Sequence, residues 1–211
     1  MAYVTAAQLL ATLGVTPDAQ KTSDATAAVN AATNAIDELC QRKNTTSRDG
    51  FGIDADASQV RYYSPVALDH LDIDDLVTLT SLVTRDDGGN VDTSDSGLQT
   101  WTANTDFVTT PMNAASQGWP YTRLETLPTG HYTFNTFYPR SVKVTGKFGW
   151  PSVPAAVVDA CTLLSERLYK MKREAPLGVL AMAEVAVRVG TGDQNLRILL
   201  GPYTAHRGSV A

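Results

Sequence analysis

Residues 141–170 read SVKVTGKFGWPSVPAAVVDACTLLSERLYK, and they decide the fold because one periodicity gives way to another within them. Up to Phe148, apolar residues alternate with polar ones, as in a strand with one buried and one wet face. Pro154 keeps Val153 out of the helical region but itself suits a first helical turn. Apolar residues then recur at helical spacing, so we predict a helix over residues 154–174.

A second long amphipathic helix is predicted over residues 24–43, with Asp37 outside its apolar stripe. Neither long helix can bury its stripe alone, so we expect the two to pack together. Shorter helices are expected over residues 5–14 and 193–203, with Cys40 and Cys161 as buried thiols rather than disulfide or zinc ligands. The expected helical core is Val29, Ile36, Leu39, Val157, Leu164 and Leu168.

The segment between the two long helices has the pattern of short antiparallel strands. RDDGGN (85–90) is a hairpin signal, and VAVRVG (185–190) is a possible further strand. The runs that we expect to be strands are VRYYS (60–64), LVTLTSLVT (76–84), LQTWT (98–102), DFVTT (106–110), YTRLET (121–126), HYTFNTF (131–137) and SVKVTGKFG (141–149).

The expected fold class is therefore α+β: a small helical bundle with an inserted antiparallel β subdomain. Residues 1–43 and 151–200 form the two halves of the helical part. Residues 44–150 form the insert, and residues 201–211 form a C-terminal arm.

Charge is distributed unevenly along the chain, whose formal net charge is −5. Residues 49–140 carry four basic and thirteen acidic side chains, whereas residues 141–211 carry nine basic and five acidic ones. An acidic middle argues against a nucleic-acid reader, which would neutralise phosphates with a basic face. There is no long apolar run and no basic, hydrophobic start, so we expect no membrane segment or leader, and assembly in a cytoplasm.

Motifs for chemistry are weak, so we expect neither an enzyme nor a cofactor. Asp54, Asp56 and Ser58 resemble the start of a calcium loop, but its sixth and twelfth positions are Gln59 and Pro65. DHLDIDD (69–75) matches no metal-binding spacing and is read as a solvated loop. Glycine-rich phosphate loops and a nucleophile elbow are missing from the sequence.

Aromatic residues gather in the insert, and we expect them to form its core. They are Trp101, Trp119, Tyr121, Tyr132, Phe134, Phe137 and Tyr138. A ligand- or carbohydrate-binding β module on a helical scaffold is the alternative that would use these rings on a surface. An unrecognised hydrolase, using one of only three histidines, is a further alternative.

Three stretches together resemble the head-to-tail adaptor, or connector, proteins of long-tailed bacteriophages, particularly those infecting actinobacteria. They are AYVTAAQLLATLGV (2–15) with AATNAIDELCQR (31–42), DFVTTPMNAASQGWPYTRLE (106–125), and VKVTGKFGWPSVPAAVVDACTLLSERLYKMKREAPLGV (142–179). The third is the most specific, because it joins a strand ending in Gly-x-Phe-Gly-Trp to a Val-Pro step and an Ala-containing helix with a basic end.

The resemblance implies a structural virion protein that forms a ring, usually of twelve copies, under the portal at the head–tail interface. Its partners would be further copies of itself, the portal protein and the next neck or tail-completion protein, with DNA passing through without specific binding. The C-terminal extension of the family reaches towards the portal. Here the portal-docking residues would be Pro202, Tyr203, His206 and Arg207.

Overall fold

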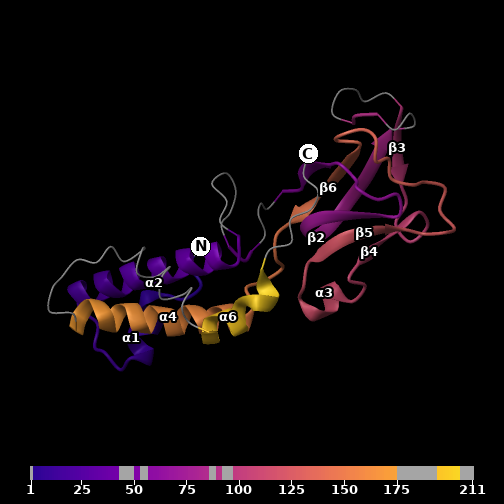
Figure 1. Cartoon of the computed structure of the whole chain (residues 1–211). Helices are drawn as coiled ribbons and strands as arrows, with labels where there is room; N and C mark the ends of the chain where they lie inside the picture. Colours follow the sequence, from indigo (N-terminus) through magenta and orange to yellow (C-terminus); the bar gives the residue numbers. More distant parts are fainter. Residues whose placement is uncertain are drawn as a thin grey trace. The chain divides into compact units, whose positions relative to one another are not determined.

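The computed structural model describes residues 2–42, 50–52, 57–85, 89–91, 97–174 and 194–204. The chain divides into two compact units. A helical unit combines the residues up to Phe51 with Val153–Thr204, and a β unit comprises Gly52–Ser152 (Figure 1). The mixed α+β class is confirmed: two long helices pack together, and a six-stranded antiparallel sheet accompanies them.

Two helices of the helical unit, α1 and α2, have side-chain caps at their N-termini. Thr5 and Gln8 form a reciprocal capping box at the start of α1, and Asp18 caps α2 by accepting a hydrogen bond from the Lys21 amide at 2.7 Å. Because Asp18 supplies that cap, α2 begins at Ala19, five residues before the predicted start at residue 24, and it ends at Leu39. The elements are α1 (Ala6–Thr12), α2 (Ala19–Leu39), α4 (Ala155–Glu174), α6 (Gln194–Leu200) and the 3-10 turn η1 (Gly201–Tyr203).

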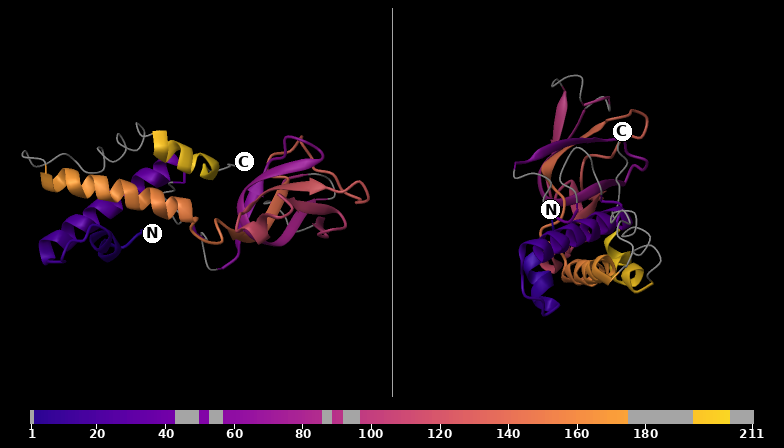
Figure 2. Two further views of the ribbon diagram at one scale, coloured as in Figure 1. Left: turned by 90° about the horizontal axis from the view of Figure 1, so that it is seen from below. Right: turned by 90° about the vertical axis from the view of Figure 1, so that its left-hand side faces the viewer.

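The two long helices, α2 and α4, pack along each other as predicted (Figures 1 and 2). Of the six expected core residues, Leu39 is half-buried and the other five are at most 2 % exposed. Asp37 is the exception to the predicted polar face, because it is buried beneath the N-terminal segment. The buried positions along this contact include Val29, Ala32, Ile36, Val157, Ala160, Cys161, Leu164 and Leu168.

One long bent strand, β2, organises the β unit, since it pairs antiparallel with β6, β5 and β3. The sheet order is β1-β6-β2-β5-β4, with β3 added beside β2. Position 146 of β6 accepts only glycine, because a Cβ there would lie 2.4 Å from the Thr78 carbonyl oxygen. The elements are β1 (Gln59–Tyr63), β2 (His70–Arg85), β3 (Leu98–Trp101), β4 (Phe107–Thr110), α3 (Ala114–Gln117), β5 (Tyr121–Thr126) and β6 (Val142–Phe148).

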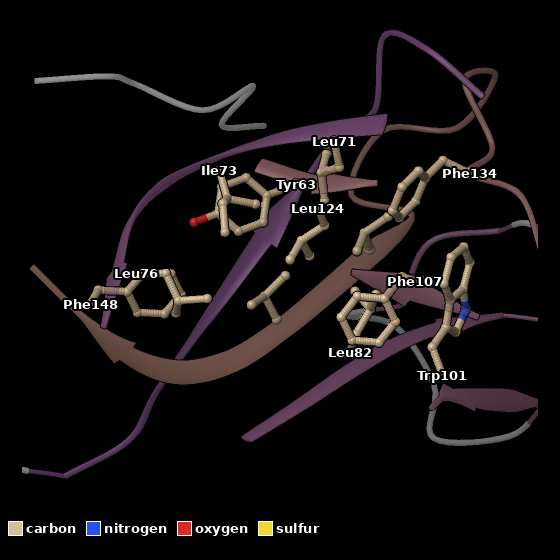
Figure 3. Packing of buried hydrophobic residues seen from close by; sticks show 12 residues of the cluster. Tyr63, Leu71, Ile73, Leu76, Leu82, Trp101, Phe107, Leu124, Phe134 and Phe148 are labelled. Atoms are coloured by element: carbon tan, nitrogen blue, oxygen red, sulfur yellow. The ribbon is translucent and has the colours of Figure 1, made fainter. Parts of the chain in front are cut away.

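The core of the β unit lies on one face of this sheet (Figure 3). Side chains of β6 alternate between buried and half-buried positions, which confirms the predicted two-faced strand. The buried members are Tyr63, Leu71, Ile73, Leu76, Leu82, Trp101, Phe107, Leu124, Phe134, Val142, Val144 and Phe148.

Two local predictions in the insert are wrong. HYTFNTF (131–137) forms no strand, because its Phe134 amide donates to the Leu68 carbonyl of another loop at 3.0 Å instead of joining a ladder. DHLDIDD (69–75), predicted as a loop, contains the start of β2, with Leu71 and Ile73 in the core. The possible strand at 185–190, Asp193 and residues 86–88 of the predicted hairpin lie outside the described residues.

Candidate interaction surfaces

The Gly-Trp-Pro segment (149–151) joins the end of β6 to β2 and to the start of the β unit through hydrogen bonds. The Trp150 indole donates to the Asp75 carboxylate at 3.1 Å, and the Gly149 amide donates to the Asp75 carbonyl at 2.8 Å. The Trp150 amide donates to the Gly52 carbonyl at 2.8 Å, so the segments entering and leaving the β unit are hydrogen-bonded to each other. Trp119 packs on Trp150 with ring centroids 5.1 Å apart. These residues therefore have a structural task within their own unit.

The start of the expected C-terminal arm packs on its own helical unit. Tyr203 meets Phe51 edge to face at 6.1 Å, and the Tyr203 carbonyl accepts a hydrogen bond from Arg42 Nε at 3.0 Å. The Arg42 guanidinium in turn lies 4.5 Å above the Phe51 ring. Tyr203 is thus an aromatic anchor for its own chain. Pro202 beside it is exposed, and His206 and Arg207 lie outside the described residues.

Beneath this contact, Tyr3 ties the chain start to α2. Its hydroxyl donates to the buried carboxylate of Asp37 and accepts a hydrogen bond from the Phe51 amide at 3.1 Å. Burial and the negative charge of Asp37 both raise the pKa of Tyr3 well above its usual range. Gly50 has φ near +90°, and a Cβ at this position would overlap the Tyr3 hydroxyl, so only glycine fits.

An apolar loop patch lies on the β unit, and we define it as Val66, Leu68, Phe137 and Tyr138. Their side chains are 73, 57, 88 and 51 % exposed, which is unusual for such large apolar groups. The patch is built on two loops that bond to each other: Arg140 donates its amide to Ser64 at 3.0 Å, and Phe134 donates to Leu68. Hydrogen bonds within the loops thus hold exposed apolar side chains in place.

The expectation that the aromatic residues form the core is right for some of them only. Trp101 stacks on Phe134 at 4.8 Å inside the core, and its indole donates to Thr84 at 2.8 Å. Phe137 and Tyr138 point to solvent. The stacked rings are therefore buried and offer no sugar-binding platform, while the exposed rings belong to the apolar loop patch.

Acidic residues at the start of β2 are paired within the chain. Asp72 binds Arg123 at 2.7 Å, which raises the pKa of the guanidinium, and Asp74 binds Arg61 at 2.8 Å. Asp69 binds His70 at 2.8 Å, and the hydrogen bond from the imidazole lowers the pKa of the carboxyl. Within the described residues, no group of three or more His, Cys, Asp or Glu side chains is placed to hold a metal ion. The calcium-like stretch falls mostly on residues 53–56, outside the described residues.

Comparison of the chain with protein-family models, curated proteins and solved structures found no match. No helix in the described ranges has both the length and the apolar character that crossing a membrane requires.

The burial of Asp37 and Asp75, two of the four buried aspartates among the described residues, was not predicted from the sequence. Both lie in acidic runs, which on composition alone are typical of solvated surfaces. Their partners, Tyr3 and Trp150, are 34 and 75 residues away in the chain. The signal that could have found Asp75 is its place after Leu71 and Ile73, whose alternation marks a strand.

Proposed function

We propose that this protein is a structural component of a bacteriophage particle. Identical copies form a ring under the portal, join the DNA-filled head to the tail or neck, and leave a channel for DNA. The observation that carries the proposal is the resemblance of nearly the whole chain to head-to-tail adaptors, strongest over residues 142–179. That stretch includes β6, the Gly-Trp-Pro turn and α4.

Exposed apolar surfaces on both units support self-association. The β unit presents the apolar loop patch, and the helical unit presents Ile198 and Leu199 of α6, which are 67 and 37 % exposed. On the same short helix, Leu196 and Leu200 are buried. Identical subunits that join through two different surfaces make a heterologous contact, which closes into a ring when the rotation permits.

The acidic middle of the chain fits passage of DNA without specific binding. Residues 49–140 carry nine more acidic than basic side chains. Wherever such a surface faces DNA, it repels the phosphates. It has no excess of cationic side chains to displace the counterions of the DNA, so it gains no electrostatic affinity for DNA. The proposal assigns no catalytic step to the protein.

For attachment to the portal, we assign the C-terminal arm. Tyr203 and Arg42 hold the start of the arm on the helical unit, so the residues that follow leave from a fixed point. Exposed Pro202 and the donors His206 and Arg207 are the expected contacts. Repetition of a short contact around a ring raises the total affinity through effective concentration.

The test is portal binding by the full chain and by a truncated chain of residues 1–204. This truncation keeps Tyr203 and its contacts, so the unfolding midpoint should not change. We expect the full chain to bind the portal protein encoded by the same genome, and the truncated chain to lose at least about tenfold in affinity. Unaltered affinity after truncation would remove the arm from the proposal. Failure of the full chain to bind portal would contradict the proposed function itself.

A further inference from the structure

A cationic pocket lies on the helical unit, where the α1–α2 connection meets the end of α4. Its volume is about 430 Å³. Leu13 and Val15 give it an apolar wall, and Lys21, Lys170 and Arg173 give it positive charge. Tyr169 completes the lining. Lys170 and Arg173 lie near the C-terminal end of α4, where the helix dipole favours positive side chains.

Positive charge exceeds negative charge around this pocket. Lys21 is paired with Asp18 at 2.9 Å. The buried carboxylate of Asp24 is shared between Lys172 at 2.7 Å and Arg173 at 3.5 Å, and the hydrogen bond from Lys172 lowers its pKa. The residues that line the pocket include three cations and no carboxylate, and Lys170 forms no ion pair within the described residues.

Tyr169 provides an independent sign of a ligand. Its side chain is 3 % exposed and lines the pocket, yet its hydroxyl has no hydrogen-bond partner among the described residues. A buried hydroxyl without a partner costs free energy, so native structures rarely leave one unsatisfied. The Arg173 guanidinium lies 5.8 Å from the Tyr169 ring centre, which places a charged donor beside this hydroxyl-bearing ring.

We propose that this pocket binds an anionic oxygen group, a phosphate or a carboxylate, with Lys170 and Arg173 as charge partners and Tyr169 as a hydroxyl donor. Charge-assisted hydrogen bonds to such oxygens are the strongest that these side chains make. The apolar wall of Leu13 and Val15 suits an anion that carries a short aliphatic part, such as a glutamate side chain. The site is independent of the proposed role in the virion.

The test is isothermal titration of the full chain with two probes at constant ionic strength: inorganic phosphate and an N-acetylated pentaglutamate peptide. We expect saturable binding of at least one probe, and the probe that binds identifies the source of the anion. Lys170→Gln should weaken binding about fivefold or more, because one charge-assisted contact is lost. Arg197→Gln is the matched control: Arg197 is an exposed cation on α6 outside the pocket, and its loss should leave the affinity unchanged.

Tyr169→Phe separates a binding role from a structural one. It should weaken binding without lowering the unfolding midpoint of the free protein, because the hydroxyl has no partner there to lose. The proposal is overturned if neither probe binds saturably, or if Arg197→Gln weakens binding as much as Lys170→Gln. It is also overturned if Tyr169→Phe lowers the unfolding midpoint and leaves binding intact.

Discussion

The Tyr3 hydroxyl is hydrogen-bonded to two buried groups, the Asp37 carboxylate and the Phe51 amide. Asp37 is 2 % exposed, and an ionised carboxylate is stable at such a position only with hydrogen-bond donors around it. At the scale of single residues, this contact joins the chain start, α2 and the residue that precedes the β unit. A conservative change at Tyr3 should therefore have a large effect.

Tyr3→Phe should lower the free energy of unfolding by about 1–3 kcal/mol, because it leaves a buried carboxylate without one of its donors. Urea unfolding followed by circular dichroism measures the change. Tyr138→Phe, at a half-exposed ring, is the control and should change stability by less than about 0.5 kcal/mol. Equal, small effects of both substitutions would show that the Tyr3 contact does not stabilise the fold.

The hydrogen bond between Tyr3 and Asp37 should also make the free energy of unfolding depend on pH. The folded pKa of Tyr3 lies above the unfolded value of 10.0, so above that pH the unfolded chain releases a proton that the folded chain retains. The stabilising contribution is complete below the unfolded pKa and is lost as pH rises above it. The wild-type protein should therefore lose stability more steeply than Tyr3→Phe in alkaline solution, whereas parallel curves would contradict the raised pKa.

At the scale of elements, the contact between α2 and α4 stabilises the helical unit. Leu164, with no exposed surface, lies at the centre of the α4 stripe, and Met171, two turns later on the same helix, is 40 % exposed. Replacing a buried leucine with alanine removes apolar contacts and leaves a cavity. The two positions thus offer a buried and an exposed substitution within one helix.

Leu164→Ala should cost about 2–5 kcal/mol of unfolding free energy, and Met171→Ala less than about 1 kcal/mol. The more severe Leu164→Asp should unfold or aggregate the chain, because it buries an unpaired charge. Thermal and urea unfolding of the helical signal at 222 nm measure both. A melting temperature unchanged by Leu164→Ala would show that this stripe is not core.

Local sequence predicted α1, α2, α4, α6 and five of the strands, because their periodicity repeats over several residues, but it did not predict the short helix α3. It failed where long-range partners decide the structure. Asp72 and Asp74 can lie in β2 because Arg123 and Arg61 neutralise them, and neither arginine is adjacent in sequence. Around Phe134, aromatic residues suggested a strand, but the Leu68 loop takes the hydrogen bond that a strand would need.

The same limit applies to the candidate surfaces. From composition, Phe134 and Phe137 were both expected in the core. In the structure Phe134 is 1 % exposed and Phe137 is 88 % exposed. Tertiary packing decides this difference, and the local sequence does not encode it. Tyr203 packs against Phe51 in the structure, and its role in docking to the portal stays a prediction. The docking roles of Pro202, His206 and Arg207 stay predictions.

At the scale of the whole molecule, a β unit is inserted into a helical unit, and each unit exposes an apolar surface of its own. Hydrogen bonding between Trp150 and Gly52 lets the insert begin and end at one place, so the helical chain continues from α2 to α4 without disturbing their packing. In such a subunit, the helical unit and the β unit can each offer one surface to a neighbouring subunit. A solitary binding module would not need two.

The most direct test of the central claim is the mass of the purified full chain, measured by light scattering with its particles imaged by electron microscopy. We predict a closed ring of identical subunits, alone or once portal is added. Phe137→Ser, which removes the most exposed ring of the apolar loop patch, should shift the population towards smaller species. A protein that stays monomeric at every concentration, with and without portal, would contradict the account.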